Sequence, residues 1–333
     1  MSRTRSYVAA LTLTLLLAGC ASVQSKKPVE LPKQPMGMAN ISISPVTNDA
    51  ERESGLRVSP DGRIMLFNIE AGETRATSGS IFDALRMPER SKGNSVGASY
   101  QGVSIAMMEL GKPGKSIVSQ QGARDPSLLA DSKSFVFSML QGNQALLARS
   151  AIGQQISAVR FLSPMPCVSY DQQPSVSPDG RMILFATAAA DQSSTVATMD
   201  LQAGAAKCKI LFPGQLPQWS PTGRSFVFQR TVNGFRQLFV FEEAQNLLTQ
   251  ITFGAFDNYE PAWSPEGKKL VFTTTRNGNA NIYMINTDGT ELVQITQGPT
   301  RDHSPAWARD GRVFFVSNAG GQEDIWQAVL QTR

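Results

Sequence analysis

Histidine and carboxylate side chains are the first candidates for chemistry in this sequence. His303 is the only histidine among 333 residues, so catalysis or metal binding through imidazole has one candidate. Acidic residues recur in loops just before proline-containing apolar segments, which we expect to form the innermost strands around a central channel: Asp125, Asp171, Asp257, Glu260 and Asp302. With His303 they could form an acidic ring at one mouth of a central channel, which would dock a partner or hold a hard cation. Alternatively, they cap local backbone amides.

One serine matches a hydrolase motif by pattern alone. Ser95 lies in Gly93-Asn94-Ser95-Val96-Gly97, and such a nucleophile requires a strand before it and a helix after it. Here the motif falls in a polar insertion, about residues 73–101, that offers neither. We therefore expect no catalytic residue, no metal and no cofactor.

The N-terminal residues predict export and a lipid anchor. Arg3 and Arg5 precede a mostly apolar run, Val8 to Gly19, that is too short to span a bilayer and suits a signal peptide. The run ends in Leu17-Ala18-Gly19-Cys20, which resembles the bacterial lipobox, although an ordinary signal peptide with an incidental cysteine remains the alternative. The resemblance implies a signal peptide over residues 1–19 and lipidation of Cys20.

Residues 20–38 follow as a polar stretch rich in proline and lysine, which reads as a flexible tether. By the lipoprotein sorting rule, Ala21 in place of an aspartate favours the periplasmic face of the outer membrane. Removing Arg3 and Arg5 from the 31 basic residues leaves 29 against 27 acidic ones. This balance excludes an electrostatic argument for nucleic acid.

Two cysteines remain after Cys20. Cys167 and Cys208 fall in neighbouring repeat units, as described next, and such cysteines often pair in an oxidising envelope. Sequence does not give the Cα separation that a bridge requires, so both the bridged and the free state stay open.

A turn pattern recurs six times and divides the chain into units. The copies are Ser59–Gly62, Ala130–Ser132, Ser177–Gly180, Ser220–Gly223, Ser264–Gly267 and Ala308–Gly311. Each unit holds short β-rich segments separated by turn signals, which is typical of propeller blades. The pattern predicts an all-β fold over residues 39–333: a six-bladed β-propeller of four-stranded blades, with the insertion in the first blade.

The ends of the repeat predict how the ring closes. The sixth unit ends after its third strand, and the alternating run Asn40–Ser44 precedes the first unit. We expect this N-terminal strand to complete the last blade, because an open edge would otherwise remain. Trp219, Trp263 and Trp307 recur at intervals of 44 residues and should pack between adjacent blades rather than bind a ligand.

These repeats resemble the TolB-type propeller, most clearly from Glu260 to Gly298 and again from Ser304 to Val329. The resemblance spans about residues 50–333 and implies a periplasmic six-bladed propeller that binds proteins, as TolB binds the lipoprotein Pal at its channel mouth. TolB carries an α/β domain before its propeller and is soluble, whereas here only a tether separates Cys20 from the first unit. The sequence therefore resembles a TolB-like lipoprotein distinct from TolB.

We expect a non-catalytic, lipid-anchored interaction module that docks an envelope protein, such as a Pal-like lipoprotein, at the channel mouth. Two alternatives stay open: a hydrolase or lyase that uses channel acids and a bound cation, and a glycan- or peptidoglycan-binding module.

Overall fold

The computed structural model describes residues 36–37, 41–70, 100–154, 159–162, 167, 170–188, 194–201 and 208–330. The signal peptide, Cys20, most of the tether and Ser95 lie outside these residues, as does the insertion apart from Tyr100 and Gln101. Among the described residues, no helix is long and apolar enough to cross a bilayer.

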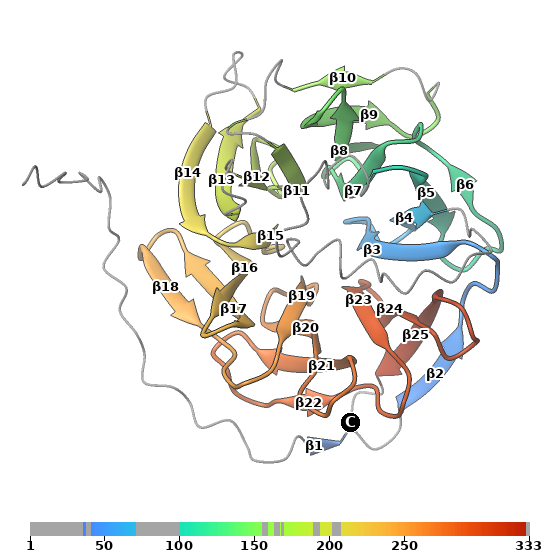
Figure 1. Cartoon of the computed structure of the whole chain (residues 1–333), viewed down its shortest axis with the longest axis vertical. Helices are drawn as coiled ribbons and strands as arrows, with labels where there is room; N and C mark the ends of the chain where they lie inside the picture. Colours follow the sequence, from blue (N-terminus) through green and yellow to red (C-terminus); the bar gives the residue numbers. More distant parts are fainter. Residues whose placement is uncertain are drawn as a thin grey trace, which may run out of the picture.

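Six antiparallel sheets surround a central channel, one per repeat unit, so the predicted six-bladed propeller is confirmed (Figure 1). The inner strands are β3 (Arg52–Val58), β7 (Ala123–Leu128), β11 (Tyr170–Val176), β15 (Gln215–Trp219), β19 (Asn258–Trp263) and β23 (Asp302–Trp307). The second strands are β4 (Ile64–Glu70), β8 (Ser134–Gln141), β12 (Met182–Ala188), β16 (Ser225–Val232), β20 (Lys269–Thr274) and β24 (Arg312–Ser317).

The third strands are β5 (Val103–Glu109), β9 (Gln144–Ala151), β13 (Ser194–Asp200), β17 (Phe235–Glu242), β21 (Asn281–Asn286) and β25 (Asp324–Leu330). The outer strands are β6 (Ser116–Ile117), β10 (Arg160–Phe161), β14 (Cys208–Pro213), β18 (Leu247–Gln250), β22 (Val293–Gln294) and, for the last blade, β2 (Ile41–Pro45). We number the blades 1 to 6 in the chain order of their inner strands.

The N-terminal strand closes the ring as predicted. β2 pairs antiparallel with β25 from Ile41↔Leu330 to Pro45↔Trp326. A further short strand, β1 (Met36–Gly37), pairs in parallel with β22 on the outer edge of blade 5. The sequence did not predict β1, which lies within the stretch assigned to the tether. The N-terminal segment thus covers the outer edges of two blades (Figure 1).

A buried carboxylate joins blade 1 to the closing blade. Glu53 of β3 is 0% exposed and accepts hydrogen bonds from the Thr47 hydroxyl at 2.6 Å and the Ile325 amide at 2.9 Å. Lys115 lies 3.0 Å from the same carboxylate. Burial raises the pKa of Glu53, while Thr47 and Lys115 act in the opposite direction. This cluster holds together the first and last elements of the ring.

Apolar side chains pack between neighbouring blades. Trp219 of blade 4 packs with Leu184 and Val196 of blade 3. Trp263 of blade 5 packs with Val227 and Leu238 of blade 4, and Trp307 of blade 6 packs against a cluster that includes blade 5 residues. The predicted packing role of the recurring tryptophans is therefore confirmed.

Candidate functional site

Every inner strand carries a bulge at the same position. The ladder shifts register at Ser54/Arg57, Arg124/Ser127, Gln172/Ser175, Gln215/Gln218, Tyr259/Ala262 and His303/Ala306. One residue in each bulge has a positive φ, from 49° to 62°: Gly55, Asp125, Gln173, Leu216, Glu260 and Ser304. A left-handed conformation is strained for residues other than glycine, and proline follows it in five of the six strands. The bulges therefore need support from their surroundings.

Side chains of the preceding blade supply that support in four places. The amide of Asp125 donates to Asn68 Oδ1 at 2.8 Å, and that of Leu216 donates to Gln173 Oε1 at 2.9 Å. The amide of Glu260 donates to Gln229 Oε1 at 3.2 Å. The amide of Ser304 donates to Glu260 Oε2 at 2.7 Å. The bulges thus link neighbouring blades through backbone donors that would otherwise lack a ladder partner.

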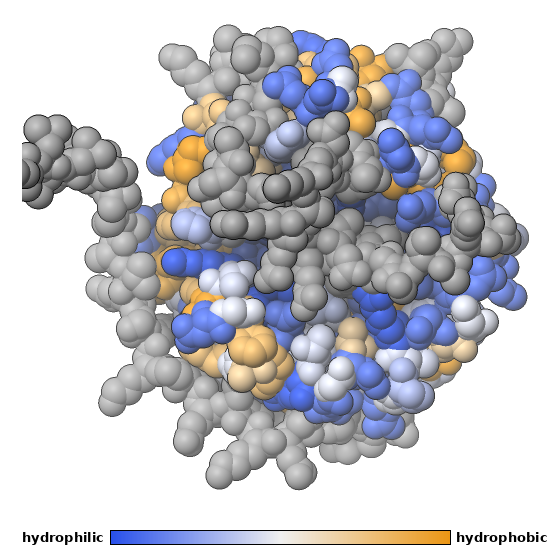
Figure 2. Space-filling view, viewed as in Figure 1, coloured by the Kyte–Doolittle hydropathy of each residue, from blue (hydrophilic) through white to orange (hydrophobic). Residues whose placement is uncertain are grey.

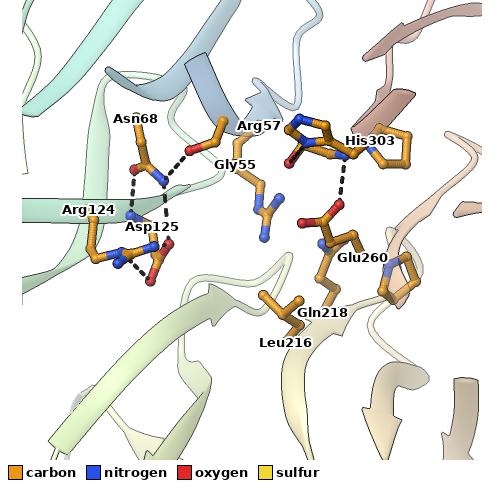
Figure 3. A pocket seen from close by; sticks show the side chains of 13 residues that line it. Gly55, Arg57, Asn68, Arg124, Asp125, Leu216, Gln218, Glu260 and His303 are labelled. Atoms are coloured by element: carbon orange, nitrogen blue, oxygen red, sulfur yellow. Dashed lines mark hydrogen bonds and ion pairs between the residues drawn. The ribbon is translucent and has the colours of Figure 1, made fainter. Parts of the chain in front are cut away.

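The bulges of blades 1, 2, 4, 5 and 6 line a narrow cavity in the channel, of about 40 Å³ (Figure 3). The charged and larger polar side chains in its wall are Arg57, Asn68, Arg124, Asp125, Gln218, Glu260 and His303. The inner strands begin at this end of the channel, which we call the upper mouth.

Asp125 and Arg124 form an ion pair on one side of the upper mouth. Arg124 Nε lies 3.4 Å from Asp125 Oδ2, and the two side chains are 10% and 13% exposed. The guanidinium of Arg124 also lies over the Tyr100 ring, 5.5 Å from its centroid. Burial raises the pKa of Tyr100, which keeps the phenol neutral beside this pair.

Glu260 and His303 lie on the other side of the upper mouth. Besides the Ser304 amide, Glu260 Oε2 accepts a hydrogen bond from the Thr273 hydroxyl at 3.2 Å. His303 is 1% exposed, and its Nε2 lies 3.5 Å from Glu323 Oε1. Burial alone would raise the pKa of Glu323, but His303, Arg301 and Arg52 lower it overall. His303 is therefore buried, with its ring facing the Glu323 carboxylate.

Arg57 extends between these two sides into the middle of the channel (Figure 3). Its Nη1 donates to its neighbour's carbonyl, Leu56 O, at 2.9 Å. Burial lowers the pKa of Arg57, and the charges of Asp125 and Glu260 counteract this only in part. The carboxylates of Asp125 and Glu260 thus act on the positive charge of Arg57 from a distance.

Three predicted residues lie away from the cavity wall. Asp257 forms an ion pair with Arg236, 2.7 Å between Oδ2 and Nη2. Asp302 is 2% exposed and accepts a hydrogen bond from the Ser317 hydroxyl at 2.6 Å. Asp171 is 1% exposed and accepts one from the Cys167 amide at 2.7 Å. The cavity wall does include Asp125, Glu260 and His303. It also includes Arg57 and Arg124, so it carries both signs of charge and is not an acidic ring.

The predicted placement of these residues before the inner strands needs correction. Asp125, Asp171, Glu260, Asp302 and His303 lie inside those strands, and Asp257 alone precedes one. The prolines suggested that each strand starts at the proline. Pairing with the second strand instead continues on the N-terminal side of the bulge, as in Tyr259↔Thr273.

Arg57, Arg124, Asn68 and Gln218 of the cavity wall were missed. Arg57 and Gln218 each stand two residues before the serine that opens the recurring turn, a position that every unit shares, so the repeat itself could have identified it. Asn68 lies on a second strand, and only the three-dimensional pairing of blades places it at the channel.

Cys167 and Cys208 are joined by a disulfide in the structure, with Cα atoms 6.1 Å apart. The bridge ties the connection between blades 2 and 3 to the outer strand β14 of blade 3. In the part of the chain that the structure describes, no group of three or more His, Cys, Asp or Glu side chains is placed to hold a metal ion.

Comparison with known proteins agrees with this architecture. A family model described as the TolB beta propeller domain matches residues 216–332, just over a third of the chain. No curated protein sequence matches the chain.

Several solved structures share the fold. TolB from Acinetobacter baumannii is 15% identical with a TM-score of 0.56, over 82% of this chain and 78% of that chain. Oligogalacturonate lyase from Vibrio parahaemolyticus is 10% identical with a TM-score of 0.56, over 88% and 97%. The tricorn protease is 11% identical with a TM-score of 0.55, over 83% of this chain and 26% of that chain. With the matched repeat in blades 4 to 6, the chain is a TolB-like six-bladed β-propeller.

Proposed function

We propose that this protein is a non-catalytic, lipid-anchored module of the bacterial envelope that docks a partner protein at its upper mouth. The observation that carries the proposal is the narrow, charge-lined cavity. Its volume of about 40 Å³ is well below the ~300–1,000 Å³ typical of small-molecule pockets. The site offers positioned charges rather than room for a substrate, which suits contact with side chains of a partner.

The surroundings of the upper mouth also suit docking. Gly254, in the loop between β18 and β19, has a φ of 134°, and an added Cβ would lie 2.4 Å from the Phe256 ring. Arg236 is held between Asp257 and the Tyr259 ring, whose centroid is 3.8 Å away. Such a constrained loop loses little conformational entropy on binding. On the coloured part of the face drawn in Figure 2, hydrophilic and hydrophobic residues are interspersed.

The proposed location follows from Cys20 and Ala21, and it places the propeller at the periplasmic face of the outer membrane, attached by the lipid anchor. The partner is then another envelope protein, such as a Pal-like lipoprotein. The similarity to an oligogalacturonate lyase concerns the fold, and one propeller fold hosts many functions. The small cavity of the upper mouth does not favour a hydrolase or lyase site at that end of the channel.

Site-specific photocrosslinking tests the proposal. We would place p-benzoylphenylalanine at Ala255, an exposed residue of the loop before β19, and separately at Glu266, an exposed residue of a turn at the opposite end of the channel. Irradiation of intact envelopes should give a discrete adduct, identified by mass spectrometry, from the Ala255 position that the Glu266 position does not give. Adducts that are the same from both positions would contradict the proposal.

Charge variants complete the test. Asp125→Asn removes a carboxylate from the cavity wall while leaving the backbone bond to Asn68. The adduct should weaken at least several-fold with Asp125→Asn and persist with Glu266→Gln, which makes the same charge change at the opposite end. An adduct that is insensitive to Asp125→Asn would show that the upper mouth does not recognise the partner.

A further inference from the structure

The opposite end of the channel opens into a larger funnel, which we call the lower mouth. Its volume is about 370 Å³, within the ~300–1,000 Å³ range of ligand pockets. The inner strands end there, and all six blades contribute to its wall. The lower mouth is a surface separate from the upper mouth, so an inference about it goes beyond the proposed function.

Equivalent residues of the six repeats form three tiers in this funnel. The deepest tier consists of Arg57, Ser127, Ser175, Gln218, Ala262 and Ala306. The middle tier consists of Val58, Leu128, Val176, Trp219, Trp263 and Trp307. The outer tier consists of Pro60, Ala130, Pro178, Pro221, Pro265 and Arg309.

The charges of the tiers have one sign. Arg57 in the deepest tier and Arg309 in the outer tier are the charged residues of the lining, and no carboxylate lines the funnel among the residues that the structure describes. The middle tier is wholly apolar or aromatic. A complementary occupant is therefore apolar where it meets the middle tier and negatively charged at its inner end.

Arg57 has donors to offer such an occupant. A guanidinium has five N–H donors, and within the described part of the chain Arg57 makes one hydrogen bond, to Leu56 O. Arg57 lines both the cavity of the upper mouth and the funnel, so its head group separates the two. The lowering of its pKa shows that Asp125 and Glu260 compensate its desolvation incompletely. A carboxylate that entered from below would supply the missing charge.

The walls favour a peptide over a sugar. Trp219 and Trp263 are 9% and 7% exposed, so their rings are packed between blades and do not present open faces for stacking on a pyranose, and Trp307 is half-buried. Prolines and small side chains form the remaining wall, which suits an extended chain. We propose that the lower mouth binds an extended apolar peptide whose carboxylate pairs with Arg57.

Fluorine NMR can test this directly. The chain has four tryptophans, of which Trp219, Trp263 and Trp307 line the funnel, while Trp326 lies on β25 opposite Pro45 and does not line it. Protein labelled with 5-fluorotryptophan would be titrated with N-acetyl-Leu-Pro-Leu bearing a free carboxylate, and with the same peptide as its amide. The acid should shift the funnel signals saturably and leave Trp326 in place. The amide should bind about tenfold more weakly, the expected effect of losing a charged hydrogen-bonded pair.

Two variants locate the charge. Arg57→Gln should remove the difference between acid and amide, whereas Arg63→Gln should keep it, because Arg63 is exposed in the same blade and does not line the funnel. Equal binding of acid and amide to the wild-type protein would overturn the proposal, and this comparison stands even if Arg57→Gln fails to fold. The proposal would also be wrong if Trp326 shifted with the other signals, or if glucuronate shifted the funnel signals and the peptide did not.

Discussion

Asp171 is a buried carboxylate, and its surroundings offset the cost of burying its charge only in part. It is 1% exposed, and it accepts a hydrogen bond from the Cys167 amide. Burial raises the pKa of Asp171 to about 6, although that amide and Thr187 act to lower it. The sequence suggested that Asp171 would face a partner. In the fold it is buried, and its protonation affects the free energy of unfolding.

We predict that Asp171→Asn stabilises the protein near neutral pH. The carboxyl titrates near 3.8 when unfolded and near 6 when folded, so the folded state binds the extra proton between these values. The unfolding free energy of the wild-type protein should therefore fall, relative to the variant, as pH rises from about 4 to about 6. Above that, the variant should be more stable by up to about 3 kcal/mol.

Urea unfolding from about pH 4 to about pH 8 measures this difference. Glu266→Gln serves as the control, because Glu266 is exposed and its substitution should leave the pH dependence as in the wild type. Parallel curves for wild type and Asp171→Asn across the range would contradict the prediction.

At the scale of elements, the turn between the inner and second strands differs in one blade. Glycine occupies its last position with φ from 68° to 89° in five turns: Gly62, Gly180, Gly223, Gly267 and Gly311. In blade 2 the residue is Ser132, with φ 51°. A side chain in this conformation costs about 1–2 kcal/mol, so blade 2 carries strain that the other turns avoid.

Ser132→Gly should therefore raise the unfolding free energy by about 1 kcal/mol, the part of that strain not offset by glycine's larger unfolded-state entropy. The reciprocal change Gly180→Ser should lower it by a similar amount, because an added Cβ meets nothing within 4 Å and only the backbone strain differs. Guanidinium denaturation of both variants measures the pair. A destabilised Ser132→Gly protein would argue that the serine side chain makes a contact worth more than the strain.

The regular elements were predictable because each repeat unit shows the same pattern of strands and turns. The short β-rich segments of each unit are strands in the structure, and the closing strand expected over residues 40–44 agrees with β2 within a residue. The bulges were not predictable, because a proline inside a strand looks like its start until pairing on both sides is known. For the same reason Asp302 and His303 were expected in a loop. The Glu323 partner of His303 is 20 residues away in the chain, and only the fold brings it near.

At the scale of the molecule, the N-terminal strands lie on the outer rim of the ring. β1 and β2 lie on the outer edges of blades 5 and 6, so the described chain begins at the rim of the ring (Figure 1). Attachment through the rim leaves both mouths of the channel free of the chain's own closing strands. An anchored propeller of this design can present either mouth to a partner.

Lipidation of Cys20 is the prediction on which this arrangement depends. Wild-type protein expressed in a Gram-negative host should incorporate labelled palmitate and sediment with the outer membrane, because more than one acyl chain gives stable attachment. Cys20→Ser should abolish the label. Cys167→Ser is the matched control: it also removes a cysteine, in this case one that the structure places in a disulfide, and it should retain the label.

A version that starts at Ala21 behind a cleavable signal peptide should be released by osmotic shock with its propeller folded, because the closing strands begin at Met36. Palmitate retained by Cys20→Ser would refute the anchor and leave the channel mouths as the only supported functional surfaces.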